Sequence, residues 1–240
     1  MIEKAFKFKQ FTIEQDHCAM KVGTDGVLLG AWTSLENNPQ TILDIGAGTG
    51  LIALMLAQRS AARQIDALEI DEDAYEQCVE NFENSPWADR LFCFHASLDE
   101  FAEEPEGETY DLIVSNPPFF LPNETEHIPE NRKKARFYDS LPFEDLINYA
   151  TQLLSETGSL AIVIPFAEEE KVIAFAKAKS LFVNRITRVR GTEKAPIKRS
   201  LLQFSFMEKP VEEQKLIIEV ARHNYTNGFK SLVKDFYLKL

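Results

Sequence analysis

An Asn-Pro-Pro-Phe run, Asn116 to Phe119, is the segment of this chain whose residue types most clearly suggest chemistry. It follows Leu-Ile-Val at residues 112–114, an apolar run that predicts a buried strand. Two consecutive prolines fix two φ angles and remove two backbone donors, so the segment is expected to form a stiff loop. Such a loop holds the Asn116 side chain and the Pro117 carbonyl ready to accept hydrogen bonds from an amino group, while Phe119 stacks on a flat substrate.

A second segment, residues 44–50, reads Asp-Ile-Gly-Ala-Gly-Thr-Gly and joins an apolar strand to an apolar helix. Glycines in this context permit positive φ angles and let a ligand approach the backbone. A dinucleotide-binding loop would need a third glycine at position 51, which is Leu51 here. Asp44 at the head of the loop suits a cationic group such as an α-ammonium. The predicted ligand contacts are Asp44, Gly46, Gly48 and Gly50.

Two further polar residues follow the next predicted strands. Glu69 ends the strand at residues 65–70, where a carboxylate can bind both hydroxyls of a ribose. Ser97 follows the strand at residues 91–95 and is a candidate contact for an adenine ring. Because the carboxyl ends of parallel strands share one edge of a sheet, we expect these side chains to converge with Asn116 in one crevice.

The elements that must position these residues alternate between strand and helix from residue 41 to 179. This alternation predicts an α/β fold, a mostly parallel sheet with helices on both faces. Alternating apolar residues predict a strand over residues 6–13, and a short helix is expected over 232–238. We expect one domain over residues 1–240, in which residues 1–35 extend over the ligand site and 36–240 form the catalytic core.

A helix is expected to begin at Thr24 or Asp25, either of which can cap it. Its polar N-terminus suits a ligand with a carboxylate or phosphate, so Lys21 and Thr24 are candidate ligand contacts. A capped surface helix without a ligand explains the same spacing equally well.

The amino-acid composition is typical of a globular protein and not of a membrane protein. The 240 residues are 45% hydrophobic and 27% charged, values that are ordinary for a globular protein. No apolar run reaches the length of a membrane span, and the first residues lack an apolar signal core, so we expect a cytosolic protein without membrane contact. Three widely spaced cysteines favour neither a disulfide framework nor a zinc site.

The net charge of −12 argues against a general nucleic-acid binder, yet the average conceals two basic clusters. Each is either a solvated loop or a surface for RNA phosphates. The candidate RNA-binding residues are Arg132, Lys133, Lys134 and Arg136 in the first cluster, and Arg188, Arg190, Lys198 and Arg199 in the second.

Together, the glycine loop, Glu69 and the Asn-Pro-Pro-Phe run resemble the class I S-adenosylmethionine-dependent methyltransferases. The resemblance implies a Rossmann-like fold with a seven-stranded sheet, S-adenosylmethionine as the cofactor, and no metal. It implies ribose binding by Glu69 and methylation of a planar amino nitrogen at Asn116, Pro117 and Phe119. Ser97 departs from the family, many of whose members have an aspartate against the adenine amino group.

A closer resemblance, to the bacterial tRNA adenine-N6 methyltransferase family, rests on three separate segments. They are residues 21–32, the Asn-Pro-Pro-Phe-Phe run, and the end of the chain from Tyr225-Thr226 to Leu238. This resemblance implies methyl transfer to N6 of adenine 37 in a valine tRNA. We expect the enzyme to be a monomer.

Three alternatives stay open at the level of sequence. The Asn-Pro-Pro motif also occurs in methyltransferases that act on protein glutamine or on rRNA guanine N2. A nicotinamide-dependent oxidoreductase is disfavoured by Leu51 and by the Asn-Pro-Pro-Phe loop. A catalytically silent RNA-binding module is disfavoured because both the cofactor motif and the acceptor motif are intact.

Overall fold

The structure is a computed structural model and describes residues 5–103, 109–118 and 141–240. The predicted stacking ring Phe119 and the first basic cluster, residues 132–136, lie outside the described residues. Within the described part of the chain, no helix is both long and apolar enough to cross a membrane.

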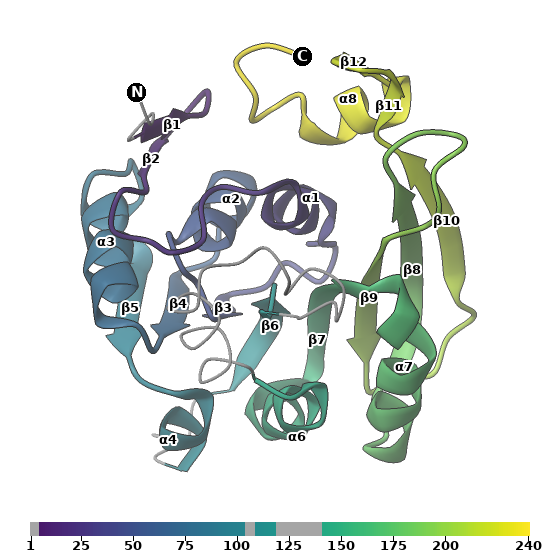
Figure 1. Cartoon of the computed structure of the whole chain (residues 1–240). Coiled ribbons are helices and arrows are strands. Elements are labelled where there is room, and N and C mark those ends of the chain that lie inside the picture. Colours follow the sequence, from purple (N-terminus) through teal and green to yellow (C-terminus); the bar gives the residue numbers. More distant parts are fainter. Residues whose placement is uncertain (1–4, 104–108, 119–140) are drawn as a thin grey trace, which may run out of the picture.

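A central sheet of eight strands organises the molecule, in the order β10-β8-β9-β7-β6-β3-β4-β5 (Figure 1). Only β9 runs antiparallel to its neighbours, which confirms the mostly parallel α/β prediction. The count differs from the expected seven, because β10 pairs with β8 as an added edge strand. The strands are β3 (Thr41–Ile45), β4 (Gln64–Glu69), β5 (Leu91–His95), β6 (Tyr110–Ser115), β7 (Leu154–Pro165), β8 (Phe182–Arg190), β9 (Arg199–Ser205) and β10 (Glu212–Ile217).

Helices cover both faces of this sheet, as expected (Figure 1). One face carries α1 (Thr24–Trp32), α2 (Leu51–Arg59) and α3 (Glu72–Glu83), and the other carries α4 (Leu98–Glu103), α6 (Phe143–Leu153) and α7 (Glu169–Ala178). An apolar cluster lies on each face of the sheet, and successive residues of β3 point to opposite faces. Ile42 packs in the cluster beneath α1 and α2, and Leu43 packs in the cluster beneath α6 and α7. This period-two burial explains why the central strands are almost wholly apolar.

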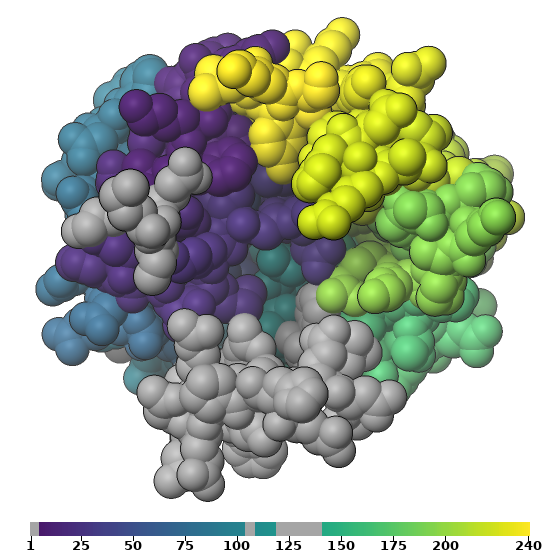
Figure 2. Space-filling view, turned by 45° about the horizontal axis from the view of Figure 1, so that its top comes forward, coloured from purple at the N-terminus to yellow at the C-terminus, as the bar shows by residue number. Residues whose placement is uncertain are grey.

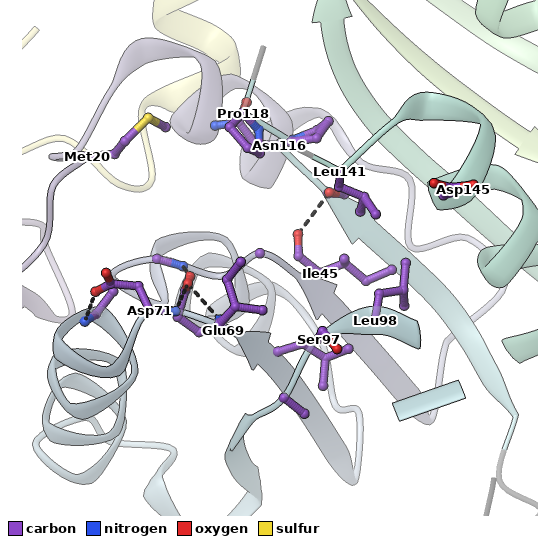
Figure 3. A pocket seen from close by; sticks show the side chains of 18 of the residues that line it. Met20, Ile45, Glu69, Asp71, Ser97, Leu98, Asn116, Pro118, Leu141 and Asp145 are labelled. Carbon is purple, nitrogen blue, oxygen red and sulfur yellow. Dashed lines mark hydrogen bonds between the residues drawn. The ribbon is translucent and has the colours of Figure 1, made fainter. Parts of the chain in front are cut away.

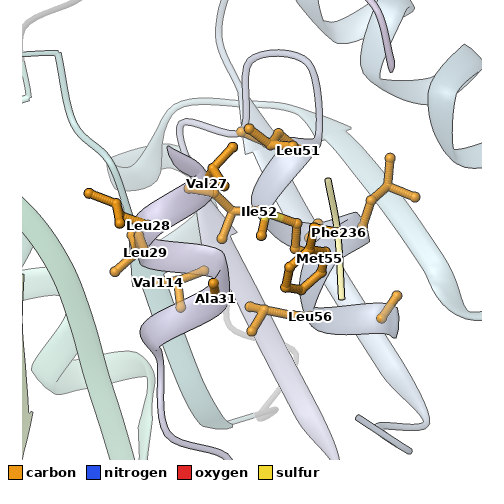
Figure 4. Packing of buried hydrophobic residues seen from close by; sticks show 14 of the residues in the cluster. Val27, Leu28, Leu29, Ala31, Leu51, Ile52, Met55, Leu56, Val114 and Phe236 are labelled. Atoms are coloured by element: carbon orange, nitrogen blue, oxygen red, sulfur yellow. The ribbon is translucent and has the colours of Figure 1, made fainter. Parts of the chain in front are cut away.

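Among the described helices, the most extensive contact lies between α1 and α2 (Figure 4). Leu28, Leu29 and Met55 are fully buried there, and each such side chain contributes about 1.5–3 kcal/mol of apolar burial. A Cβ at Gly30 would stand 2.7 Å from Met55 Sδ, so this glycine permits the close approach of the two helices. α1 begins after Gly23, which has no side-chain cap, and the expected caps at Thr24 and Asp25 lie inside the helix instead.

The N-terminal strand prediction is wrong in detail. Residues 6–13 are not one strand but belong to an antiparallel hairpin of β1 (Ala5–Lys7) and β2 (Thr12–Glu14). Apolar alternation does not reveal the turn between them, in which the Phe8 N–H donates to the Phe11 carbonyl.

The C-terminal helix prediction is also shifted. After the small hairpin of β11 (Glu219–Ala221) and β12 (Asn224–Tyr225), α8 spans Asn227–Val233 rather than 232–238. Thr226 sets its start, because its Oγ1 accepts the Phe229 N–H at 3.2 Å. The tail beyond α8 reaches the N-terminal hairpin, where the Lys9 N–H donates to the Phe236 carbonyl at 2.9 Å. The N-terminal hairpin and the C-terminal tail therefore lie side by side on one face (Figure 2).

Candidate active site

A cavity of about 620 Å³ opens at the carboxyl ends of β3, β4 and β6. The strand order reverses between β3 and β6, which is where α/β sheets bind ligands. In Figure 3, Met20, Asn116 and Pro118 lie across the cavity from Glu69 and Ser97. Of the predicted site residues, Gly46, Gly48, Glu69, Ser97, Asn116 and Pro117 line it.

The glycine-rich loop adopts three left-handed conformations, with φ of 71° at Gly46, 55° at Gly48 and 76° at Gly50. A Cβ at Gly46 or Gly48 would meet nothing within 4 Å, so these two leave open space beside the backbone. Gly50 differs, because its Cβ would stand 2.5 Å from the Phe82 ring and 2.9 Å from Cys78 Sγ. Gly46 and Gly48 thus face the cavity, whereas Gly50 lets α3 pack closely behind the loop.

The Glu69 carboxylate holds the loop from the cavity side. Its Oε2 accepts the Gly48 N–H at 2.7 Å, and its Oε1 accepts the N–H groups of Ile70 and Asp71 at 2.9 and 3.0 Å. Burial raises the pKa of Glu69, and these backbone donors oppose that rise. The residue is placed as predicted, in a rigid position at the end of β4.

Asp44 occupies a different place from the one its motif suggests. It is fully buried and does not line the cavity, and its Oδ2 accepts the Ala53 N–H at 3.0 Å. Burial raises the pKa of Asp44 to about 7. The geometry makes Asp44 an anchor for the first turn of α2, while a contact between its carboxylate and a ligand ammonium stays a prediction.

Ser97 lines the cavity but is already engaged at the start of α4. Its Oγ donates to Glu100 Oε2 at 2.7 Å, and its backbone N–H donates to the same oxygen at 3.0 Å. In return, the Glu100 N–H donates to Ser97 Oγ at 3.4 Å, and this reciprocal arrangement is a capping box. The neighbouring Asp99 also lines the cavity, at the edge where the sequence placed an adenine contact.

The Asn-Pro-Pro loop, residues 116–118, begins where β6 ends. Ser115 is fully buried and its Oγ donates to the Ile45 carbonyl at 2.8 Å, which ties β6 to β3 just before Asn116. On the other side, α1 approaches Asn116, since a Cβ at Gly26 would lie 3.9 Å from Asn116 Nδ2. Asn116, Pro117 and Pro118 therefore form one wall of the cavity that the glycine loop and Glu69 also line.

Residues 15–22, which we call the strap, connect β2 to α1 along the cavity. Cys18, Ala19 and Met20 of the strap line it. The predicted contacts Lys21 and Thr24 do not line it, so their role toward a ligand stays a prediction. Cys18, Ala19 and Met20 drew no individual prediction from the sequence, which gave only the expectation that residues 1–35 extend over the ligand site.

Two residues of α6, Asp145 and Tyr149, also line the cavity and were missed. α6 reads from the sequence as an ordinary amphipathic helix, and that pattern indicates only which side faces the core. Their spacing of four residues places them on one side of the helix, which is the signal that was available. In the described part of the chain, no cluster of His, Cys, Asp or Glu is arranged to hold a metal.

The second basic cluster is heavily paired with carboxylates. Arg188 makes a bidentate contact with the buried Glu169 and an ion pair of 2.8 Å with Glu213. Arg190 pairs with Glu193 at 2.5 Å, and Arg199 pairs with Asp25 at 2.8 Å. Lys198 is exposed. RNA binding by these four residues stays a prediction, in which any phosphate would compete with the acids for the three arginines.

Comparison with protein families places this site in context. The profile of the methyltransferase small domain matches residues 23–175. A tRNA1(Val) (adenine(37)-N6)-methyltransferase from Christiangramia forsetii is 60% identical and covers 100% of both chains. Proteins with the same name from Flavobacterium johnsoniae and Parabacteroides distasonis are 62% and 46% identical, covering 98% and 100% of this chain and 100% of their own lengths.

Solved structures share the fold at low sequence identity. A predicted O-methyltransferase from Agrobacterium tumefaciens superposes with a TM-score of 0.67 at 18% identity, over 88% of this chain and 96% of its own. A ribosomal protein L11 methylase from Lactobacillus delbrueckii gives 0.56 at 18% identity, over 80% and 83%. At these identities the likeness concerns the arrangement of sheet and helices.

Proposed function

This chain belongs to the family of tRNA1(Val) (adenine(37)-N6)-methyltransferases, and from that premise we propose that it methylates the exocyclic N6 of an adenine in tRNA, adenine 37 of a valine tRNA. The methyl donor is S-adenosylmethionine. The observation that carries the proposal is that the Asn116–Pro117 acceptor loop and the Glu69–glycine-loop wall line the same cavity.

The residues of the cavity fit this cofactor. Open space beside Gly46 and Gly48 admits a ligand to the backbone, and the buried Glu69 carboxylate suits ribose hydroxyls. Leu68, Ile70 and Leu98 offer apolar surface on the side of β4 and α4, as an adenine ring requires. When bound, S-adenosylmethionine supplies an electrophilic methyl group on a sulfonium.

The acceptor loop would raise the reactivity of the target nitrogen. The lone pair of adenine N6 is delocalised into the ring, so the nitrogen is a weak nucleophile. The Asn116 side-chain oxygen and the Pro117 carbonyl would accept its two N–H bonds, which favours a pyramidal nitrogen and orients it. Positioning of this kind can supply about 7–11 kcal/mol of barrier reduction in favourable cases.

The substrate base must be unpaired or flipped out to reach this cavity. Phe119 follows Pro118 in the sequence and would stack on the base, a contact worth about 1–3 kcal/mol. Residues 1–35, which include the strap, would cover the cofactor site as the predicted extension. No strong general base is required, because the proton leaves once the nitrogen carries positive charge.

The decisive experiment offers labelled S-adenosylmethionine with unmodified total tRNA, rRNA or release factor as the acceptor. We expect label in tRNA alone, recovered as N6-methyladenosine after digestion. Label in release factor, or in N2-methylguanosine, would instead support one of the alternative methyltransferases. Thermal stabilisation by NAD and not by S-adenosylhomocysteine would overturn the methyltransferase assignment altogether.

A further inference from the structure

Asn81 of α3 is a buried polar side chain that joins two parts of the cavity wall. It is 2% exposed, and its Oδ1 accepts the Glu14 N–H at 2.8 Å. Its Nδ2 donates to the Glu14 carbonyl and to the Thr49 carbonyl, both at 2.9 Å. One end of the amide faces an N–H and the other faces two carbonyls, so an amide in this orientation satisfies all three contacts.

The two groups that Asn81 links have separate roles. Thr49 belongs to the glycine-rich loop, and Glu14 is the last residue of β2, directly before the strap. The strap itself is fixed at two more points, since Gln77 Oε1 accepts the His17 N–H at 3.2 Å and Gln15 Oε1 accepts the Val22 N–H at 2.9 Å. An irregular segment is thus held by buried amide side chains in place of secondary structure.

The far end of the strap leads to the acceptor loop. α1 begins at Thr24, and its Gly26 approaches both Asn116 and Leu51, with a Cβ position 3.9 Å from Asn116 Nδ2 and 3.2 Å from Leu51 Cδ2. One continuous segment therefore runs from the back of the glycine loop, past Cys18 and Met20 on the cavity wall, to the acceptor site.

We propose that Asn81 is a positioning residue for methyl transfer, which locks the strap to the glycine-rich loop so that a filled cofactor site fixes the cavity wall beside Asn116. This inference rests on the proposed function. Asn81 does not line the cavity, so it acts through the loop and the strap and not by touching a ligand.

The test compares Asn81→Ala and Asn81→Asp with Glu76→Ala, a change on the exposed side of the same helix. Two measurements avoid catalysis: S-adenosylhomocysteine affinity by calorimetry, and amide hydrogen exchange over residues 14–22 with and without S-adenosylhomocysteine. We expect the ligand to slow exchange in the wild type and the Glu76 variant. In both Asn81 variants, we expect this protection to disappear and affinity to fall about 10-fold.

The aspartate variant separates positioning from space filling. Asn81→Asp keeps the volume but faces two carbonyls with an acceptor, so it should be at least as impaired as Asn81→Ala. In methyl-transfer kinetics, both variants should raise the KM for S-adenosylmethionine and leave the KM for tRNA unchanged. A fall in kcat alone would indicate only a smaller folded fraction and would overturn the proposal.

Two further outcomes distinguish failure at different levels. If the wild type binds S-adenosylhomocysteine and exchange over residues 14–22 does not change, the strap is not linked to the cofactor site, even if the Asn81 variants fail to fold. If the wild type does not bind S-adenosylhomocysteine at all, both this inference and the proposed cofactor are wrong.

Discussion

The glycine-loop side of the cavity and the second basic cluster were both predicted from residue type, yet their side chains are held in place in different ways. Glu69 ends a strand, faces the cavity and accepts three backbone N–H bonds. Arg188 and Arg199 lie on strands too, but each pairs with a carboxylate from another element. The first region is held by the backbone, and the second by partners far away in sequence.

This difference shows which sequence patterns predict where a side chain lies in the fold. The end of a parallel strand fixes where a side chain lies, because the sheet registers all such ends at one edge. A run of basic residues does not indicate where its side chains lie, because the carboxylates that pair with them come from other parts of the sequence. Glu169 lies 19 residues from Arg188, and Asp25 lies 174 residues from Arg199.

The largest effect is expected at the acceptor loop. Asn116→Ala removes the oxygen proposed to accept an N6 hydrogen, so methyl transfer to tRNA should fall on the order of 1,000-fold. S-adenosylhomocysteine affinity should stay unchanged in calorimetry. Asn84→Ala, an exposed asparagine at the end of α3, is the matched control. Near-normal transfer by the Asn116 variant would remove this loop from the chemistry.

The paired arginines should matter for stability. Arg188→Met leaves the buried Glu169 carboxylate without its bidentate partner, so the free energy of unfolding should fall by about 3 kcal/mol. Arg190→Met is the control, because its partner Glu193 is 73% exposed and the expected loss is below about 0.5 kcal/mol. Urea titrations measure both. Equal, small losses would mean that Arg188 is free for another role.

The three backbone hydrogen bonds that hold Glu69 in place can be tested by substitution. Glu69→Gln presents an amide donor to at least one of three backbone N–H groups, so S-adenosylhomocysteine affinity should fall about 10- to 100-fold. Glu72→Gln, an exposed change in the first turn of α3, should leave the affinity unaltered. Calorimetry measures both affinities. Equal affinities of the two variants would contradict the role proposed for Glu69 in ligand binding.

The smallest effect is expected at Lys198, an exposed cation of the basic cluster. Lys198→Ala should weaken tRNA binding about 3-fold at low salt and reduce the slope of log affinity against log salt by about 1. Lys177→Ala, exposed on α7, should change neither quantity. Filter binding across a salt series measures the effect. Identical slopes for the two variants would mean that the Lys198 side chain is solvated and does not contact tRNA phosphates.

Much of the fold follows from local pattern. The apolar runs of β3, β6 and β7 and the intervening helices were predictable, because fully buried parallel strands leave little room for other residue types. The errors lie where one local feature overrides periodicity. The Thr226 cap starts α8 earlier than its aromatic residues suggest, and the turn at residues 8–11 divides an alternating segment into two strands.

The site residues also differ in how far local sequence predicts their positions. Glu69, Gly46, Gly48 and Asn116 were placed by strand ends, and all of them line the cavity. Asp44 was read as a ligand contact because of its motif, but alternation along β3 turns its side chain toward α2. The cavity contacts of Cys18, Met20 and Tyr149 were not predictable, because their positions depend on long-range contacts that leave no periodic signature.

The contact between the N-terminal hairpin and the C-terminal tail has a consequence for the order of folding. Lys9 Nζ donates to the Lys234 carbonyl across a separation of 225 residues, beside the Phe8–Tyr237 bridge. Such a contact repays its loop-closure entropy only after the sheet has assembled, so we expect it to form late in folding. The N-terminal hairpin leads directly into the strap. We therefore expect the strap, which forms one wall of the cavity, to reach its native structure last during folding. It should also be the first part to unfold when the protein is heated.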